Sequence, residues 1–517
     1  MWAHRASVQR TARAGGSAAR LAAGFALSVF LAHGCSWHQP VEREVSQTID
    51  AWHRPVFQSD SAKPGECSDR TASESAPGTG ALEEGEGHNQ TRPSSSTPQL
   101  QPWTTGALAR NPTVLAAMAD ARTKLARVAQ ATALPDPFLR FAVRPEPIRT
   151  AAGDLHFTFG VGQKIPLPAR LEHAGRIAEA EVRMAIERLN ATRLQVIADV
   201  EQAYYRLYLT DRSIELTRAH RLSLENLEQV VAMQYRVGKA EQHDLLRVQT
   251  EVAKLRDNEN RLAHRRTAAA AALNQLLDYP PTGEVPTTET VHVRAFDADV
   301  EQLVALAVEH NPELAILIRQ AERDQEGVEL SDLDHWPDVT IGAEWTYIEP
   351  RDAFEPPDAP RGAVNRMSET GTDSWALMLQ FNVPIWFDRI EAAKQEARSR
   401  LLQTRHRRQA ALNMIEFRIL DAWTRVQTQQ DTIKLLESTL IPQARQTYDV
   451  SLTAYQAGRS NFLTVIDNWQ RFLDFELMLH REVAELETAF SQLQREVGLQ
   501  LVRDEIAAKT KEQGEQP

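Results

Sequence analysis

Long amphipathic helices dominate the pattern of hydrophobic and polar positions along the chain. No glycine or proline interrupts the residues between Gly175 and Gly238, and a similar stretch runs from Ile385 to Ile441, where Pro442 is expected to kink the far end. Apolar residues recur there at steps of three and four, at Ile186, Leu189, Val196, Val200, Tyr204, Leu207 and Ile214, and again at Ile415, Ile419, Ala422, Val426, Ile433, Leu436 and Leu440. This spacing predicts coiled-coil seams, and helices of this length need partner helices.

Four shorter stretches alternate in part between apolar and polar residues, which is typical of strands. They lie at about 138–144, 156–165, 338–348 and 375–383. Each is near the length that crosses an outer membrane when a strand is tilted. One such stretch alone fits a soluble hairpin that covers a helix, but four at matched positions favour a membrane wall. The alternation leaves open which face of each strand meets lipid.

The two halves of the chain follow the same plan. Three landmarks recur in the same order: Asn111-Pro112 as Asn311-Pro312, Ile165-Pro166 as Val383-Pro384, and Tyr235-Arg-Val-Gly238 as Tyr455-Gln-Ala-Gly458. The order predicts two repeats, over 100–297 and 298–500, each a helix, two strands, a long helix and a return helix. Glycine suits the left-handed conformation that ends a helix, so turns are expected at Gly238 and Gly458.

The strand count constrains the assembly. Four strands cannot close a barrel, and each unpaired backbone group at an edge costs several kcal/mol in lipid. The smallest barrels have about eight strands. Two chains would supply about eight strands and three about twelve, and only the larger ring leaves a wide lumen. The sequence therefore predicts that several subunits share one barrel.

The N-terminus resembles a secretory signal, which we assign to residues 1–34. Arg5, Arg10, Arg13 and Arg20 precede the apolar stretch 21–32, which is too short to span a bilayer. Cys35 follows a small residue, as at a bacterial lipoprotein cleavage site, and is a candidate for lipidation; an ordinary signal cut nearby is the alternative. Residues 35–99 are polar and predict a flexible tether, and 501–517 form a polar tail.

Charge and cysteine usage exclude several classes of function. A net charge of −12 argues against a nucleic-acid partner, because phosphate binding needs a basic face. The two cysteines, Cys35 and Cys67, provide neither a disulfide framework nor a metal-knuckle spacing. A glycine-rich phosphate loop, a nucleophile elbow and a His-Glu zinc helix are all absent from the sequence. We therefore expect a protein that is not an enzyme and has no cofactor, metal site or catalytic residue.

The duplicated Asn-Pro helix start, the strands ending in Ile165-Pro166 and Val383-Pro384, and the two Tyr-x-x-Gly turns resemble the TolC family of outer-membrane efflux proteins. The resemblance covers nearly all of 100–500. It implies a homotrimer whose twelve-stranded barrel, four strands per chain, lies in outer-membrane lipid and continues into a long α-helical coiled-coil tunnel across the periplasm. Its partners would be a periplasmic adaptor (membrane fusion) protein and an inner-membrane pump. The helix starts are closest to members of heavy-metal resistance systems.

The resemblance also implies roles for single residues near the turns. Gly238 and Gly458 would lie at the tips where the adaptor docks. Asp244 and Tyr455 match positions of the link that closes the periplasmic entrance. Asp467 matches one aspartate of the ring at the constriction, where three copies would favour cations. This chain departs from the family pattern in two places, since Ser460 stands where an arginine joins the link and Thr464 replaces the second aspartate.

Three functions fit these features. The first is an outer-membrane channel that passively conducts small solutes, metal cations or drugs, exported by an inner-membrane pump in a tripartite system. The second is the exit duct of type I protein secretion. The third is a periplasmic coiled-coil scaffold or adaptor, although an adaptor would have one helical hairpin inside a β-rich chain. The polar loop 350–373 is expected outside the cell, with the shorter loop 149–154 beside it.

Overall fold

The computed structural model describes residues 100–150, 152–291, 293, 295–350 and 371–501. These residues form two compact units, one of 121–184 and 317–406 and the other of 100–120, 185–316 and 407–501. The elements, in chain order, are α3 (Leu100–Arg110), α4 (Pro112–Thr132), β1 (Phe138–Thr150), β2 (Gly153–Ile165), α5 (Pro168–Arg236), α6 (Gln242–Leu276), α7 (Val300–His310), α8 (Pro312–Asp332), η1 (Leu333–His335), β3 (Val339–Glu349), β4 (Ser374–Phe381), α9 (Phe387–Leu435), η2 (Leu436–Leu440), α10 (Ile441–Gln456) and α11 (Phe462–Val497). None of the helices among these residues is long and apolar enough to cross a membrane.

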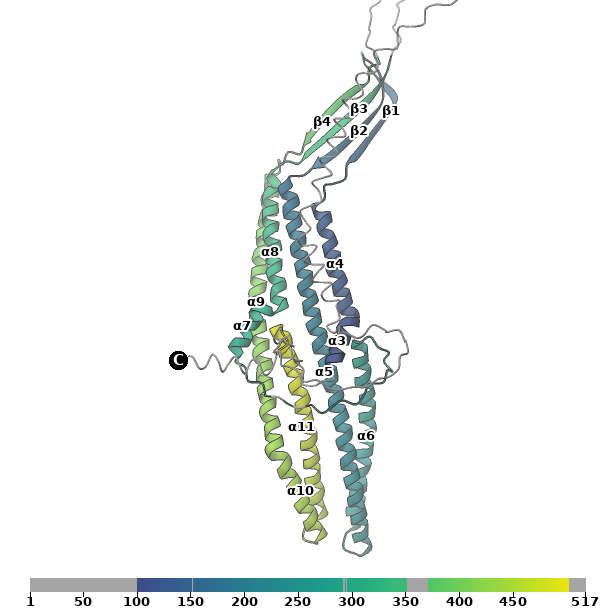
Figure 1. The fold of residues 1–517 in the computed structure, drawn as a ribbon, viewed down its shortest axis with the longest axis vertical. Coiled ribbons are helices and arrows are strands. Elements are labelled where there is room, and N and C mark those ends of the chain that lie inside the picture. The colour runs from purple at the N-terminus through teal and green to yellow at the C-terminus, as the bar shows by residue number, and fades with distance from the viewer. Residues whose placement is uncertain (1–99, 151, 292, 294, 351–370, 502–517) are drawn as a thin grey trace, which may run out of the picture. The chain divides into compact units, whose positions relative to one another are not determined.

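The first unit contains the sheet. Its four strands are antiparallel and follow the order β1-β2-β3-β4, so β1 and β4 are its edges (Figure 1). An ion pair of 2.8 Å joins Lys164 at the end of β2 to Asp338 at the start of β3. Arg170 on α5 lies 3.8 Å from the same carboxylate. These charges hold the strand ends of both repeats against the start of the long helix.

Helical segments of the same unit pack through buried polar contacts as well as apolar ones. Thr404 on α9 donates to the Asp324 carboxylate on α8 at 2.6 Å, and both residues are buried. Arg323 pairs with the other oxygen of that carboxylate. Because both oxygens of the buried carboxylate are paired, the contact aligns α8 with α9 without leaving an uncompensated charge.

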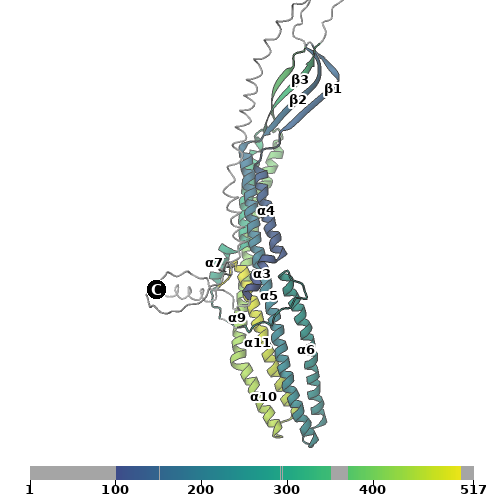
Figure 2. The ribbon, with the colours of Figure 1, turned by 45° about the vertical axis from the view of Figure 1, so that its right-hand side comes forward.

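The second unit is built from helical hairpins, α5 with α6 and α10 with α11 (Figure 2). One core cluster lies near the two turns and draws on all four helices: Leu224, Leu227, Val231, Val248, Val252, Leu255, Tyr448, Tyr455, Phe462, Val465, Ile466, Trp469 and Leu473. A second cluster joins α5, α9 and α11 with the connecting segments. Most of the predicted seam residues are buried, while Ile186, Ile214 and Leu440 are half-buried. The predicted coiled-coil faces are therefore the packed faces.

The second long helix changes its hydrogen-bond register before Pro442. Residues Leu436–Leu440 form a π-helical turn, in which the Ile441 N–H donates to the Leu436 carbonyl. Proline cannot donate to the carbonyl four residues earlier and its ring crowds that carbonyl. The π turn confines the loss of the regular hydrogen bond to one turn of the helix. The chain therefore continues as α10 after Pro442 instead of ending there.

The recurring asparagines perform the same task in both repeats. The Oδ1 of Asn111 accepts the Thr113 N–H at 2.9 Å, and its amide donates to the carbonyl of Leu276, the last residue of α6. The Oδ1 of Asn311 accepts the Glu313 N–H at 2.8 Å, and its amide donates to the Glu496 carbonyl near the end of α11 at 2.6 Å. Each buried asparagine thus caps one helix at its N-terminus and satisfies a carbonyl at the end of another.

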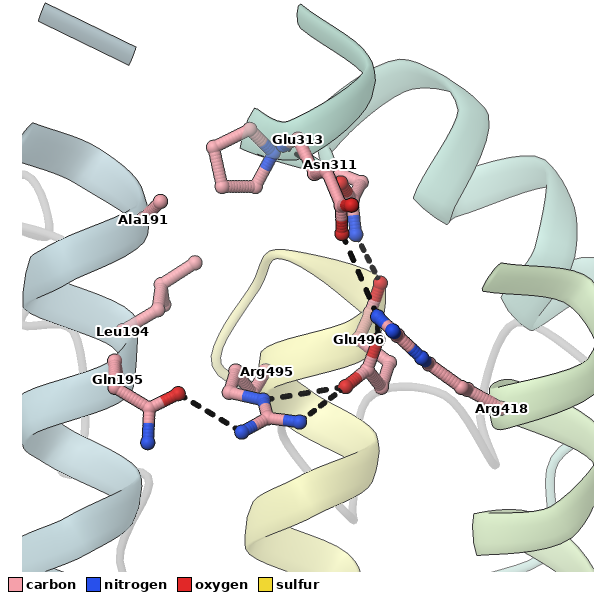
Figure 3. Close-up of a pocket in the computed structure, with 9 residues that line it drawn as sticks. Ala191, Leu194, Gln195, Asn311, Glu313, Arg418, Arg495 and Glu496 are labelled. Atoms are coloured by element: carbon pink, nitrogen blue, oxygen red, sulfur yellow. Dashed lines mark hydrogen bonds and ion pairs between the residues drawn. The ribbon is translucent and has the colours of Figure 1, made fainter. Parts of the chain in front are cut away.

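Charged side chains around Asn311 neutralise one another (Figure 3). Arg418 on α9 lies 3.5 Å from both the Glu313 and the Glu496 carboxylates. Arg495 contacts the second oxygen of Glu496 and donates to the Gln195 side-chain carbonyl on α5 at 2.8 Å. A cavity of about 420 Å³ lies among these residues. Its charges are already paired within the chain, which fits a helix junction better than a ligand site.

The strand boundaries match the expectations to within a few residues except in β1. The predicted strand ended at Arg144, but β1 continues to Thr150 through Pro145 and Pro147, with a register shift between Val143 and Ile148. Proline removes a backbone donor, and an edge strand tolerates that loss at an irregularity. The predicted end near Arg144 was therefore wrong.

Replacing Asn311 with alanine should lower stability more than replacing an asparagine that only caps. The change removes the acceptor for the Glu313 N–H and leaves the buried Glu496 carbonyl without its donor, so we expect a loss of about 2–3 kcal/mol. Asn461→Ala is the control, because Asn461 is exposed and only caps α11 through Thr464; its loss should be about 1 kcal/mol. The apparent thermal unfolding midpoints of the detergent-solubilised variants measure both. Equal midpoints would show that the Glu496 contact contributes nothing.

Candidate functional site

The register of the sheet gives it one apolar face. Trp345 on β3 pairs with Phe159 on β2 and with Trp375 on β4, and Phe159 pairs with Phe141 on β1. Alternate residues of a strand share a face, so the odd-numbered residues paired on the helix side of the register shifts at Val143/Ile148 and Leu155/Phe157 lie together. This set, the apolar face, comprises Leu139, Phe141, Val143, Phe157, Phe159, Val161, Gln163, Ile165, Val339, Ile341, Ala343, Trp345, Tyr347, Trp375, Leu377, Leu379 and Phe381.

The opposite side, the polar face, has a different composition. It comprises Phe138, Arg140, Ala142, Thr158, Gly160, Gly162, Lys164, Thr340, Gly342, Glu344, Thr346, Ser374, Ala376, Met378 and Gln380. Three of these carry charge, whereas none of the apolar face does. The register therefore shows which residues of the four strands share a face.

Many side chains of the apolar face are accessible within one chain. Leu377 is 89% exposed and Trp375 75% exposed on β4, and Leu139 and Phe141 are also exposed on β1. A contiguous apolar surface of this kind is characteristic of a surface that meets lipid or another protein. Both edge strands contribute to it.

The two helical turns have the same backbone geometry. Gly238 (φ +73°) donates its N–H to the Tyr235 carbonyl at 3.0 Å, and Lys239 donates to Gln234 at 2.8 Å. Gly458 (φ +72°) donates to Tyr455 at 2.9 Å, and Arg459 donates to Ala454 at 2.8 Å. This pair of bonds is the Schellman motif. The turn role expected for both glycines is confirmed.

Tyr455 and Asp244 lie in the same part of the second unit. The Tyr455 side chain is 6% exposed and belongs to the core cluster near the turns. Its hydroxyl has no hydrogen-bond partner among the described residues. Burial and, to a smaller degree, the negative charge of Asp244 raise the pKa of the Tyr455 phenol to about 12. The two residues are thus close enough to interact electrostatically but are not hydrogen-bonded.

Two basic residues of α6 accompany the predicted acidic ones. The ring nitrogens of His243 lie 3.0 Å from the Glu241 carboxylate and 3.2 Å from the Asp244 carboxylate. The Arg247 guanidinium lies 3.9 Å from the Asp467 carboxylate on α11. Sequence reasoning identified neither His243 nor Arg247. The available signal was their spacing of four residues, which places both on one face of α6.

Other predicted positions have simpler roles or lie elsewhere. Thr464 donates its N–H and its hydroxyl to Asn461, so it belongs to the N-terminal cap of α11. Cys35 and the loop 351–370 lie outside the described residues. Within the described ranges, no three or more His, Cys, Asp or Glu residues are grouped so as to hold a metal ion.

Comparison with solved structures identifies the fold. The outer membrane protein VceC from Vibrio cholerae has a TM-score of 0.63 at 19% identity, over 77% of this chain and 96% of that one. The CusC structure has a TM-score of 0.66 at 15% identity, over 78% and 92%. The Campylobacter jejuni CmeC outer membrane channel has a TM-score of 0.64 at 13% identity, over 81% and 89%.

The sequence itself carries the family assignment. Comparison with curated protein sequences found no match. The profile of the family described as "Outer membrane efflux protein" matches residues 103–278 and 303–498, one range within each predicted repeat. Channels of that family are homotrimers that work with an adaptor and an inner-membrane pump, and they are transport proteins, not enzymes. The chain therefore belongs to the outer membrane efflux protein family, whose members lie in the outer membrane and extend a helical tunnel into the periplasm.

Proposed function

We propose that three copies of this chain form one barrel and one tunnel. Small solutes, which are either metal cations or drugs, pass through it passively to the outside. An inner-membrane pump supplies the energy, and a periplasmic adaptor docks at the turns at Gly238 and Gly458. Cys35 is the proposed lipid attachment site.

The observation that carries the proposal is the division of the sheet into two faces. In a barrel that holds water, lipid-facing and lumen-facing residues alternate along each strand. The apolar face supplies aromatic and aliphatic side chains for lipid, and the polar face supplies Arg140, Lys164 and Glu344 for a hydrated lumen. A hairpin layer on a soluble protein would instead bury its apolar face against other elements.

The edges of the sheet support a shared barrel. Within the described residues, β1 pairs only with β2, and β4 only with β3. Each therefore offers a row of unpaired backbone groups, at several kcal/mol each in lipid. When β4 of one subunit pairs with β1 of the next, three chains close a ring of twelve strands.

We also propose that Asp244, Tyr455 and Asp467 belong to a periplasmic gate. All three lie on the two helical hairpins near their turns. The buried Tyr455 hydroxyl lacks an acceptor in this arrangement while the Asp244 carboxylate contacts His243. A hydrogen bond from Tyr455 to Asp244 would require Asp244 to give up His243 as its partner. Such an exchange of partners is suited to the opening and closing of a gate.

Adjacent substitutions on β4 test the two faces. Leu377→Arg places a charge on the apolar face, where arginine costs about 2–4 kcal/mol near the bilayer midplane. Ala376→Arg places the same charge on the polar face, beside the Glu344 carboxylate with which Ala376 is in register. We expect the first variant to be lost from isolated outer membranes and the second to accumulate near wild-type levels, measured by immunoblot of membrane fractions. The proposal is wrong if the second variant is lost and the first is retained, or if the solubilised wild-type protein has the mass of a monomer.

Substituting Tyr455 tests whether its phenol is held protonated and without a hydrogen bond in the native state. The native pKa of about 12 lies above the ordinary value of 10, so the native state favours the protonated phenol. Stability should therefore be unaffected below pH 10 and should fall as pH rises from 10 towards 12. Tyr455→Phe should match the wild-type unfolding midpoint at pH 7 and lose less stability between pH 10 and 12.

Tyr235→Phe is the matched control, because Tyr235 holds the same place in the first turn but is exposed. It should follow the wild-type curve across the whole pH range. A fall in the midpoint of Tyr455→Phe at pH 7, together with a higher conductance, would instead indicate a hydrogen bond from Tyr455 that holds the gate shut.

A further inference from the structure

The acidic residues of the proposed gate each have a basic partner on the same subunit. His243 and Arg247 lie four residues apart on α6 and face in the same direction. His243 contacts Asp244, and Arg247 contacts Asp467. On α6, Arg247 thus places a positive charge beside Asp467, and His243 lies beside Asp244 and is charged only when it is protonated.

We propose that Arg247 is a specificity-determining residue of the channel: its charge offsets that of Asp467 and lowers the preference of the entrance for cations. This inference rests on the proposed function, because it requires three subunits around a common conduit. Three Asp467 side chains alone would form a negative ring, whereas three Arg247 side chains within 3.9 Å of them make that ring neutral in sum.

The proposed effect on ion selectivity arises from the electric field of the Arg247 and Asp467 charges and not from a strong ion pair between them. The Arg247 and Asp467 side chains are 45% and 50% exposed, so their pairing contributes little to stability. Both charges still act on ions that pass nearby. Arginine in particular keeps its charge at all ordinary pH values. A solute therefore meets an entrance that does not strongly select by charge. Such an entrance fits small organic solutes of either sign better than a narrow class of metal cations.

Ion selectivity in planar lipid bilayers tests the inference. The purified wild-type trimer is reconstituted, and the reversal potential is measured across a KCl gradient. An elementary charge at about 10 Å in water changes the local concentration of a monovalent ion by about twofold, and salt near 0.1 M screens it further. Arg247→Gln should therefore raise the cation-to-anion permeability ratio by about two- to fivefold, and Asp467→Asn should lower it by a similar factor.

Three further variants make the result specific. Arg247→Lys keeps the charge and should keep the wild-type ratio. The double variant Arg247→Gln/Asp467→Asn is neutral in sum and should also stay near the wild-type ratio, even if a single change weakens the assembly. Arg256→Gln removes an exposed arginine nine residues along α6, on the opposite side of the helix at 3.6 residues per turn, where it pairs with Glu225 at 2.8 Å. It should leave the ratio unchanged.

The outcomes separate the two proposals. Wild-type protein that gives no conductance would contradict the proposed function itself. A conducting wild type whose permeability ratio does not change in Arg247→Gln would overturn the role of Arg247 alone. An equal change in Arg256→Gln and Arg247→Gln would overturn it too, because it would indicate a general effect of net charge.

Discussion

Backbone groups at the edges of a sheet need partners, and lipid supplies none. This constraint connects most features of the chain. The sheet has an exposed apolar face, which favours lipid, and among the described residues it has two open edges, which lipid does not tolerate. Both conditions are met when identical chains complete the wall. The family assignment agrees with this reasoning, since its channels are homotrimers. The apolar face and the open edges thus explain why one chain is only part of the channel.

Duplication supplies four strands from a unit of two, and the asparagines keep both copies in the same geometry. In each repeat, an asparagine before a proline caps one helix and binds a carbonyl at the end of the return helix. Proline suits the first helical position because its missing N–H would have had no partner there. The donor and acceptor of one amide therefore connect two helix ends that lie far apart in sequence. Few other residue types offer both groups at this size.

The sequence predicted the architecture well because its signals are periodic and repeated. Helix faces, strand positions and both glycine turns follow from local rules of spacing and conformation, and the duplicated landmarks confirmed each assignment against a second copy. The end of β1 was placed too early, since only the pairing of strands shows that β1 is an edge that continues through Pro145 and Pro147. The set of residues that share the apolar face also required the register between strands. The pairing of Arg247 with Asp467 was missed because an ion pair between two helices depends on the rotation of each helix, which no local pattern specifies. His243 lies next to Asp244 on the same helix and was overlooked although the two are adjacent in the sequence.

Charge near the turns is the feature of this chain that bears most directly on which solutes could pass. A channel of this kind makes few selective contacts, so small changes in fixed charge at a narrow place affect what passes more than changes in the wide parts do. The resemblance implies an arginine at the position of Ser460 and an aspartate at the position of Thr464. His243 and Arg247 add basic side chains beside the acidic residues that remain. The losses of an arginine at Ser460 and of an aspartate at Thr464 cancel in net charge, so the reduction of negative charge at the proposed entrance comes from Arg247 beside Asp467. This balance argues for a conduit that leaves the choice of solute to its pump.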